Sequence, residues 1–360
     1  MIINGIFYDI VAFLIVISII VLIHEFGHFI VAKKLGVKVE KFSLGFGPKI
    51  FGKKMGETEY VISALPLGGY VKLLGEDPSE ELSPEDEKRS YSKLSPYKKF
   101  LIIFFGPFFN FVLALIIFTI IFMMGRPVLK SVIGNVIKGR PAARAGLKKG
   151  DVITSINGIK IRSWGSLSKY IEKFGKNTIT IGVKEGKKSY FIKLKPVAIS
   201  GLNILRQKIK RYIIGIYPLQ NAVYYKYSGV LNSLYSSLKE IWFIIYITVI
   251  SLFYLIIGRL PASDLGGPIM IAQLSGRAAS LGVSDFFYFI AFISVNIGLI
   301  NLFPIPALDG GHLLFSVVEM VKRKPLSVAF QETAAKVGFA LLILLLLFVS
   351  YNDIIRTIKT

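Results

Sequence analysis

The stretch VLIHEFGHFI, residues 21–30, places two histidines and a glutamate inside a long apolar run. Ionisable side chains within a membrane helix are rare and usually functional, because burying them in hydrocarbon is unfavourable. The pattern H-E-x-x-H puts His24 and His28 about 40° apart on one face of a helix, where both can bind one metal ion. Glu25 projects about 100° away from His24, so it can act on a water molecule held by that ion. The stretch therefore predicts a zinc site with Glu25 as general base.

The composition of the chain indicates an integral membrane protein. It has 360 residues, 53% of them hydrophobic, and a mean hydropathy of +0.60. Clear candidate spans are Ile6–Ile23, Phe100–Met124, Phe286–Phe303 and Val337–Val349, with Ile241–Ile257 as a fifth, doubtful run. No Lys or Arg precedes the first run, which favours a retained span over a cleaved signal peptide. The lack of cysteine excludes disulfides and thiolate catalysis.

The distribution of basic residues predicts the topology. The net charge of +22 is interpreted as Lys and Arg in loops that flank apolar runs, so no nucleic-acid partner is expected. The lysines that follow the first span make that side cytoplasmic and leave the N-terminus outside. If Ile241–Ile257 crossed, the polar motif at 301–312 would lie opposite His24. If Ile241–Ile257 instead lies in the interface or re-enters, the motif reaches the same depth as His24 and His28, which the chemistry favours. In this topology Lys322–Lys324 lie in the cytoplasm.

Two segments between the spans have the character of folded β-rich elements. FSLGFGPKIFG and TEYVISALPLGGYVKLLG, within residues 32–99, read as short strands and turns that lie against the membrane. Residues from about 132 to 218 change to the composition of a soluble α/β module. Its sequence PAARAGLKKGDVITSINGIKI resembles PDZ domains, with YIIGIYP at 212–218 as a binding loop in a permuted arrangement.

A catalytic zinc ion needs a third protein ligand, and the chain has one histidine left. His312 ends the motif NLFPIPALDGGH, and Asp309 lies three residues before it. Pro304 and Pro306 remove helix hydrogen bonds and Gly310 frees the backbone, so the span is expected to unwind there. On the residues alone both Asp309 and His312 remain open, with the histidine slightly favoured. Asn110, in GPFFNFVLALIIF, is interpreted as an interhelical hydrogen-bonding residue.

These motifs together resemble the site-2 protease family of intramembrane zinc metalloproteases, peptidase family M50, and most closely its regulator of sigma-E protease group in bacteria. The resemblance includes FSLGFGP, PLGGYVKLLGE, GPFFNF and SVNIGLINLFPIPALDGGH. It implies one Zn²⁺ held by His24, His28 and Asp309, with Glu25 as general base. It also implies that Asn301 and the loop at Gly68, Gly69 and Tyr70 contact substrate. Supporting or structural roles remain for Asn110, Pro304, Pro306, Gly310 and His312.

The expected fold class is a polytopic α-helical membrane protein with about four transmembrane helices, a membrane-associated β-rich loop and one inserted extracytoplasmic PDZ domain. The expected segments are a first transmembrane helix at 1–31, a cytoplasmic β-rich loop at 32–99, a second transmembrane helix at 100–125, a PDZ domain at 130–218, an interfacial or re-entrant region at 219–285, a third transmembrane helix at 286–318, a cytoplasmic loop at 319–336 and a fourth transmembrane helix at 337–352.

The expected activity is zinc-dependent cleavage of transmembrane segments in regulated intramembrane proteolysis. The resemblance suggests anti-sigma factors and remnant signal peptides as substrates, in a multi-pass protein of the bacterial inner membrane. The lipid bilayer is the other expected partner, and the PDZ domain would bind a C-terminal peptide or act as a size filter. A membrane PDZ receptor or chaperone without catalysis is the main alternative, since it would not need Glu25. A serine protease fits less well, because no G-x-S-x-G pattern is present. A zinc transporter also fits less well, because it would need ionisable groups along several spans, whereas here they converge at one depth.

Overall fold

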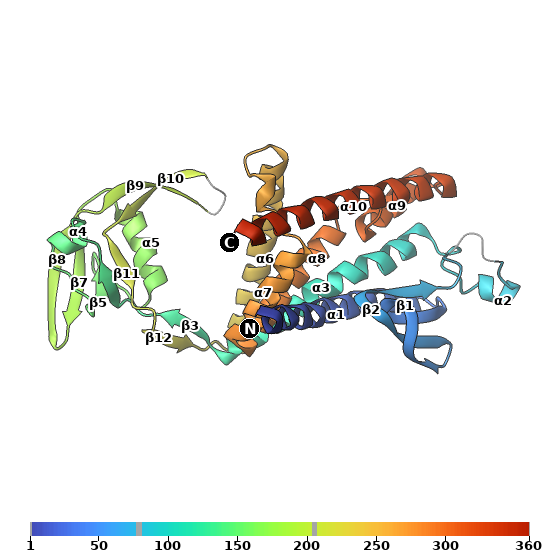
Figure 1. Cartoon of the computed structure of the whole chain (residues 1–360), viewed down its shortest axis with the longest axis horizontal. Helices are drawn as coiled ribbons and strands as arrows, with labels where there is room; N and C mark the ends of the chain where they lie inside the picture. Colours follow the sequence, from blue (N-terminus) through green and yellow to red (C-terminus); the bar gives the residue numbers. More distant parts are fainter. Residues whose placement is uncertain (1, 77–80, 204–206, 360) are drawn as a thin grey trace. The chain divides into compact units, whose positions relative to one another are not determined.

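A computed structural model describes residues 2–76, 81–203 and 207–359 of the chain (Figure 1). The chain forms two compact units. The first, the helical unit, consists of Met1–Ile120, Ser233–Leu255 and Pro261–Thr360. The second consists of Ile121–Asn232 with Ile256–Leu260, and contains an inserted module at residues 126–226.

Among the described residues, five helices are long and apolar enough to cross a membrane. They are α1 (Ile2–Lys34), α3 (Pro96–Met124), α6 (Val230–Ile256), α8 (Val283–Asn301) and α10 (Val328–Lys359). Four of them contain the clear candidate spans, and α6 contains the doubtful run at 241–257. Within the helical unit, the described residues also form three shorter helices, α2 (Pro84–Glu87), α7 (Pro268–Leu281) and α9 (Asp309–Lys322), and a short 3₁₀ turn, η1, at Ala262–Asp264.

Helix α6 makes polar contacts with both α3 and α8. Near its start, Ser237 accepts a hydrogen bond from Thr119, close to the last turn of α3. Directly after it, the carbonyl of Ala262 accepts from Asn352 in the last turns of α10. Figure 1 shows α6 running across the long axes of α1, α3 and α10. Between these contacts, Glu240 accepts a hydrogen bond from Tyr288 and Thr248 donates one to Asn296, so α6 also packs along α8.

Strands β1 (Val39–Met55) and β2 (Thr58–Leu73) form one sheet that folds back on itself. Residues 42–44 of β1 lie beside both 69–71 and 60–62 of β2. Gly45 and Gly47 adopt φ angles of 93° and 84°, which favour glycine and let the strand turn. Near residue 39 the sheet packs into a core with α1 and α3, whereas Phe51 near its far end is 66% exposed.

The segment 286–318, expected as a third transmembrane helix that unwinds near Pro304 and Pro306, contains parts of two helices. Helix α8 ends at Asn301 and α9 begins at Asp309. Pro304 and Pro306 lie in the break, where they cannot donate backbone hydrogen bonds. The break therefore turns the chain at the depth of the predicted metal site.

The inserted module has a hydrophobic core of its own, built from residues 133–216. Its main sheet has the strand order β6-β5-β7-β8, and helix α5 covers it. Strand β3 pairs with β12, so the chain enters and leaves the module side by side, outside the expected limits of 130 and 218. The elements are β3 (Arg126–Leu129), β4 (Ile133–Val136), α4 (Pro141–Arg144), β5 (Val152–Ile156), β6 (Ile159–Lys160), α5 (Trp164–Phe174), β7 (Ile179–Glu185), β8 (Lys188–Leu194), β9 (Val197–Leu202), β10 (Lys208–Ile213), β11 (Ile216–Pro218) and β12 (Val223–Lys226).

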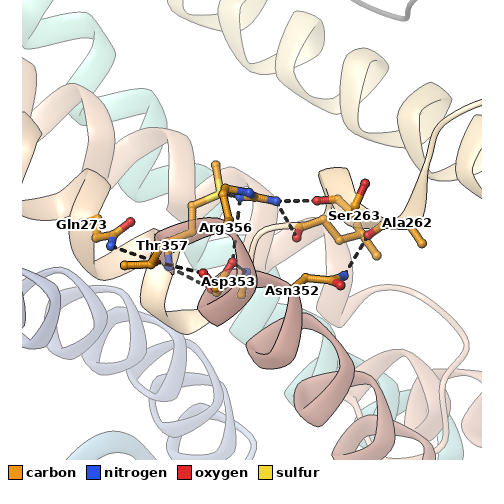
Figure 2. A network of polar contacts seen from close by, with 10 residues as sticks. Ala262, Ser263, Gln273, Asn352, Asp353, Arg356 and Thr357 are labelled. Atoms are coloured by element: carbon orange, nitrogen blue, oxygen red, sulfur yellow. Dashed lines mark hydrogen bonds and ion pairs between the residues drawn. The ribbon is translucent and has the colours of Figure 1, made fainter. Parts of the chain in front are cut away.

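A buried carboxylate joins α10 to the start of α7 (Figure 2). Asp353 accepts hydrogen bonds from the backbone N–H groups of Gly267 and Met270, at 2.9–3.1 Å. These N–H groups stand at the start of α7, where the helix itself offers no carbonyl to accept their hydrogen bonds. Arg356, one turn further along α10, donates to the carbonyls of Ser263 and Leu265. Asp353 thus caps a helix that packs on α1.

We expect Asp353→Ala to destabilise the helical unit by about 1–3 kcal/mol, because it leaves buried N–H groups without an acceptor. Thermal unfolding of the purified protein in detergent measures this change. Asn352→Ala, which removes a single bond at a less buried position, is the matched control and should lower the melting temperature much less. Equal melting temperatures for Asp353→Ala and the unaltered protein would contradict this account of α7.

Candidate metal centre

Helix α1 presents the three groups of the H-E-x-x-H motif to one cavity. His24 and His28 stand one turn apart, and their Nε2 atoms lie 3.2 Å from each other. His24 is 8% exposed, so its ring is enclosed by the surrounding helices. The geometry follows from the helix itself, because side chains at i and i+4 lie on the same face.

Asp309 completes a cluster with these two histidines. Its Oδ2 atom lies 3.0 Å from Nε2 of His24 and 3.6 Å from Nε2 of His28. Bond lengths of 2.0–2.2 Å around a tetrahedral zinc ion place neighbouring ligand atoms about 3.3 Å apart. The three observed separations scatter around that value. Oδ2 of Asp309 is buried and has no hydrogen-bond donor, which is expected of an atom that binds a cation.

The second ring nitrogen of each histidine orients the imidazole. Nδ1 of His28 lies 2.9 Å from the carbonyl of Ile102, to which it can only donate, so Nε2 keeps its lone pair. Nδ1 of His24 lies 3.3 Å from the amide of Asn110, whose Oδ1 is buried without a partner. A half-turn of this amide lets Oδ1 accept from Nδ1–H of His24. Asn110 and Ile102 thereby direct both Nε2 atoms toward one point.

Two glycines allow α1 and α3 to approach closely at the site. A Cβ atom on Gly106 would lie 2.2 Å from Nε2 of His28, and one on Gly27 would lie 2.2 Å from the carbonyl oxygen of Phe105. Small residues at a helix crossing let the backbones come together in a membrane protein. The contact between Ile102 and His28 depends on this crossing.

The cluster opens into a cavity of about 770 Å³ in the helical unit. Glu25 lines it together with Tyr70 from β2 and Asn301 from the end of α8. Gly69 brings β2 against α1, because a Cβ atom there would lie 3.2 Å from Cγ of Glu25 and 2.7 Å from the carbonyl oxygen of Ser43. The expected base and two expected substrate-contacting residues therefore share one cavity, with a strand beside it.

The remaining predicted residues have more distant positions. His312 lines the cavity, but its ring contacts Phe315 and is not part of the three-residue cluster. A Cβ atom on Gly310 would lie 2.0 Å from the carbonyl oxygen of Phe303, so this glycine lets α9 begin against the loop at Pro304 and Pro306. A Cβ atom on Gly68 would likewise clash with the ring of Phe46, so this glycine lets β2 pack against that ring.

Sequence reasoning missed several residues that build this site. Ile102 contributes only a backbone carbonyl, which carries no residue-specific signal. Gly27 and Gly106 could have been found, since a glycine in each of two apolar helices is a signal for close packing. The cavity also extends to polar side chains that no sequence pattern groups together: Glu76, Tyr91, Lys99, Glu319 and Gln331.

The fold and site define a zinc-dependent hydrolase built into a bundle of apolar helices, and the comparisons with known proteins agree. The family model "Peptidase family M50" matches residues 12–345, so the chain belongs to this family of zinc metalloproteases. A relative from Campylobacter jejuni, named "Putative zinc metalloprotease", is 39% identical over 98% of this chain and 95% of its own. Relatives of the same name from Rhizobium meliloti and Clostridium acetobutylicum are each 34% identical, over 96% and 98% of this chain and 96% and 99% of theirs.

Among solved structures, the PDZ domain of an SdrC-like protein from Listeria monocytogenes is similar to part of the chain. It is 26% identical, with a TM-score of 0.21, and covers 25% of this chain and 87% of that domain.

We expect Asp309→Ala to lose bound zinc, because the carboxylate is the third member of the cluster. His312→Ala, three residues away on the same helix, should retain one zinc per chain and is the matched control. Elemental analysis of the purified proteins gives the zinc content. Loss of zinc from the His312 variant alone would reverse the assignment.

We expect Asn110→Ala to weaken zinc affinity about 10-fold to 100-fold, the usual effect of removing a partner that orients a ligating histidine. Asn110→Asp should bind zinc nearly normally, because a carboxylate oxygen still accepts from Nδ1–H of His24. Competition with a chelator of known affinity measures both variants. Equal affinities for the alanine variant and the unaltered protein would show that Asn110 does not orient His24.

Proposed function

We propose that the protein is an intramembrane endopeptidase, which cleaves peptide bonds within transmembrane segments of other membrane proteins. One observation carries the proposal: the cluster of His24, His28 and Asp309 lies between apolar helices, beside a glutamate and a cavity of about 770 Å³. Polar groups at such a depth need a function that outweighs the unfavourable burial.

The chemistry divides between the metal and the chain. Bound zinc supplies Lewis-acid polarisation of a carbonyl and a water molecule whose pKa falls to about 7. Glu25, which lines the same cavity, takes a proton from the attacking water and gives it to the departing amine. Asn110 and the carbonyl of Ile102 hold the histidines in the tautomer that binds the ion.

Substrate would bind as an extended peptide beside β2. A transmembrane helix uses its carbonyls in internal hydrogen bonds, so it must unwind locally before hydrolysis. The edge of β2 at Gly68, Gly69 and Tyr70 offers backbone groups for pairing. The Asn301 amide, which lines the same cavity, offers a donor and an acceptor for the unwound backbone.

The membrane topology follows from charge and from the ends of the helices. Lysines at the end of α1 and in β1 support a cytoplasmic position for that side. The start of α1, the end of α10 and both ends of α6 then lie outside, with α6 in the interface. Residues 126–226 are also outside, despite their many basic residues, because long inserted domains translocate largely regardless of charge. The location would be the inner membrane of a bacterium.

In this proposal the inserted module is a PDZ domain that controls access to the site. It would bind a newly formed C-terminus or exclude proteins with bulky external domains. Anti-sigma factors with a single span and remnant signal peptides are the proposed substrates. A non-catalytic receptor or chaperone with the same module is the competing function, and it predicts no role for Glu25.

We expect Glu25→Gln to abolish cleavage of a model transmembrane substrate while zinc stays bound, because the amide cannot accept the proton. Mass spectrometry of the products after reconstitution measures cleavage and locates the scissile bond. Glu332→Gln, at an exposed residue paired with Lys336 on α10, is the matched control and should cleave normally. Products from the Glu25 variant at the normal rate would exclude the proposed mechanism, and products cut only outside the span would exclude intramembrane cleavage.

A further inference from the structure

Nearly all of the net charge belongs to the inserted module. Residues 126–226 hold 22 of the 44 Lys and Arg residues but 3 of the 22 acidic residues, a net charge of +19. The rest of the chain carries +3. The expectation that the basic residues lie in loops flanking apolar runs is therefore incomplete, because half of these residues lie in one folded module.

The three acidic residues of the module are engaged within it. Asp151 is buried and accepts from the backbone N–H of Lys148, and Glu172 accepts from the backbone N–H of Tyr212. Glu185 pairs with the Lys148 ammonium at 3.3 Å, the one ion pair among the described residues of the module. The module therefore offers a surplus of cations to an external partner.

One side of the main sheet presents these cations together with an exposed aromatic ring. In the register of β7 and β8, Gly182 lies opposite Phe191 and Lys184 lies opposite Ser189. The alternate residues of β7, such as Ile181, are buried in the core. The side chains of Lys184, Ser189 and Phe191 therefore project from the other face of the sheet. Phe191 is 75% exposed. The outward residues Lys184, Phe191 and Lys193, together with the exposed Lys195 directly after β8, form what we call the basic face.

Short connections keep the module close to a bilayer. Strand β3 begins at Arg126, two residues after α3 ends, and α6 begins four residues after β12 ends at Lys226. An extended residue spans at most about 3.6 Å. Both apolar helices thus hold the module within a short distance of any membrane that contains them, which raises its effective concentration at the headgroups.

We propose that the basic face docks on anionic phospholipid headgroups of the bilayer that holds the apolar helices, with the Phe191 ring at the interface. Lysines around an exposed aromatic ring are typical of surfaces that bind anionic membranes. Each lysine near such a surface favours docking by about fivefold. The proposal does not depend on cleavage, so it can fail or hold independently of the proposed enzymatic activity.

Fluorescence quenching in reconstituted discs tests this docking. The chain contains no cysteine, so Ser189→Cys gives a single labelling site next to the basic face. The labelled full-length protein is reconstituted in phosphatidylcholine discs, with or without about one-third phosphatidylglycerol, each with a quencher on a trace lipid headgroup. We expect quenching to rise with phosphatidylglycerol and to be lost in roughly 1 M salt, where the screening length is about 3 Å.

Two charge-matched variants locate the effect. The first changes Lys184, Lys193 and Lys195 to Gln on the basic face, and the second changes Lys169, Lys173 and Lys176 to Gln. The second set belongs to α5 and the turn after it, on the opposite side of the core. We expect the docked-to-undocked ratio to fall at least about tenfold in the first variant and to change little in the second.

Two outcomes would overturn the proposal. Quenching that ignores phosphatidylglycerol, or that falls equally in both variants, would show that the basic face does not recognise anionic lipid. Binding of an acidic peptide that is lost in the first variant, while quenching by anionic lipid stays unchanged, would assign the face to a peptide instead.

Discussion

Two imidazole nitrogens and a carboxylate oxygen lie within 3.6 Å of one another among apolar helices, and the helical unit is arranged around this contact. Without a cation, such a cluster would leave Oδ2 of Asp309 buried and unsatisfied. With zinc, the same atoms become ligands and the unfavourable burial is offset by metal binding. The metal therefore explains why the chain tolerates polar residues at this depth.

Bringing the ligands together requires unusual backbone at three places. Helix α3 must cross α1 closely enough for the carbonyl of Ile102 to reach His28, which Gly106 permits. Helix α8 must end so that Asp309 can turn toward α1, and the prolines in the break remove the hydrogen bonds that would continue it. Gly310 then lets α9 start against that break. These glycines and prolines act by shaping the backbone rather than by contributing a reactive side chain.

The parts of this arrangement that depend on local geometry were predictable from the sequence. The spacing of His24 and His28 fixes their common face, and the apolar runs identify the long helices. The third ligand was not predictable from the residues alone, because the path of the loop at 302–308 decides between Asp309 and His312, and the resemblance was needed to choose. The direction of α6 was equally open, since an apolar run reports burial but not orientation. The turn of β1 on itself depends on long-range pairing that a strand pattern does not specify.

The conformation of the proposed substrate bears on how it would reach Glu25. A helix keeps its carbonyls in internal hydrogen bonds, whereas an extended segment is narrower and exposes them to the groups that line the cavity. Once a substrate unwinds, its backbone groups lose their partners in an apolar environment, which is unfavourable by several kcal/mol for each group. Strand β2, which Gly69 brings against α1, offers new partners at that point. In the proposed reaction, the unwinding that exposes the scissile bond and the strand that would stabilise it belong to the same place in the fold.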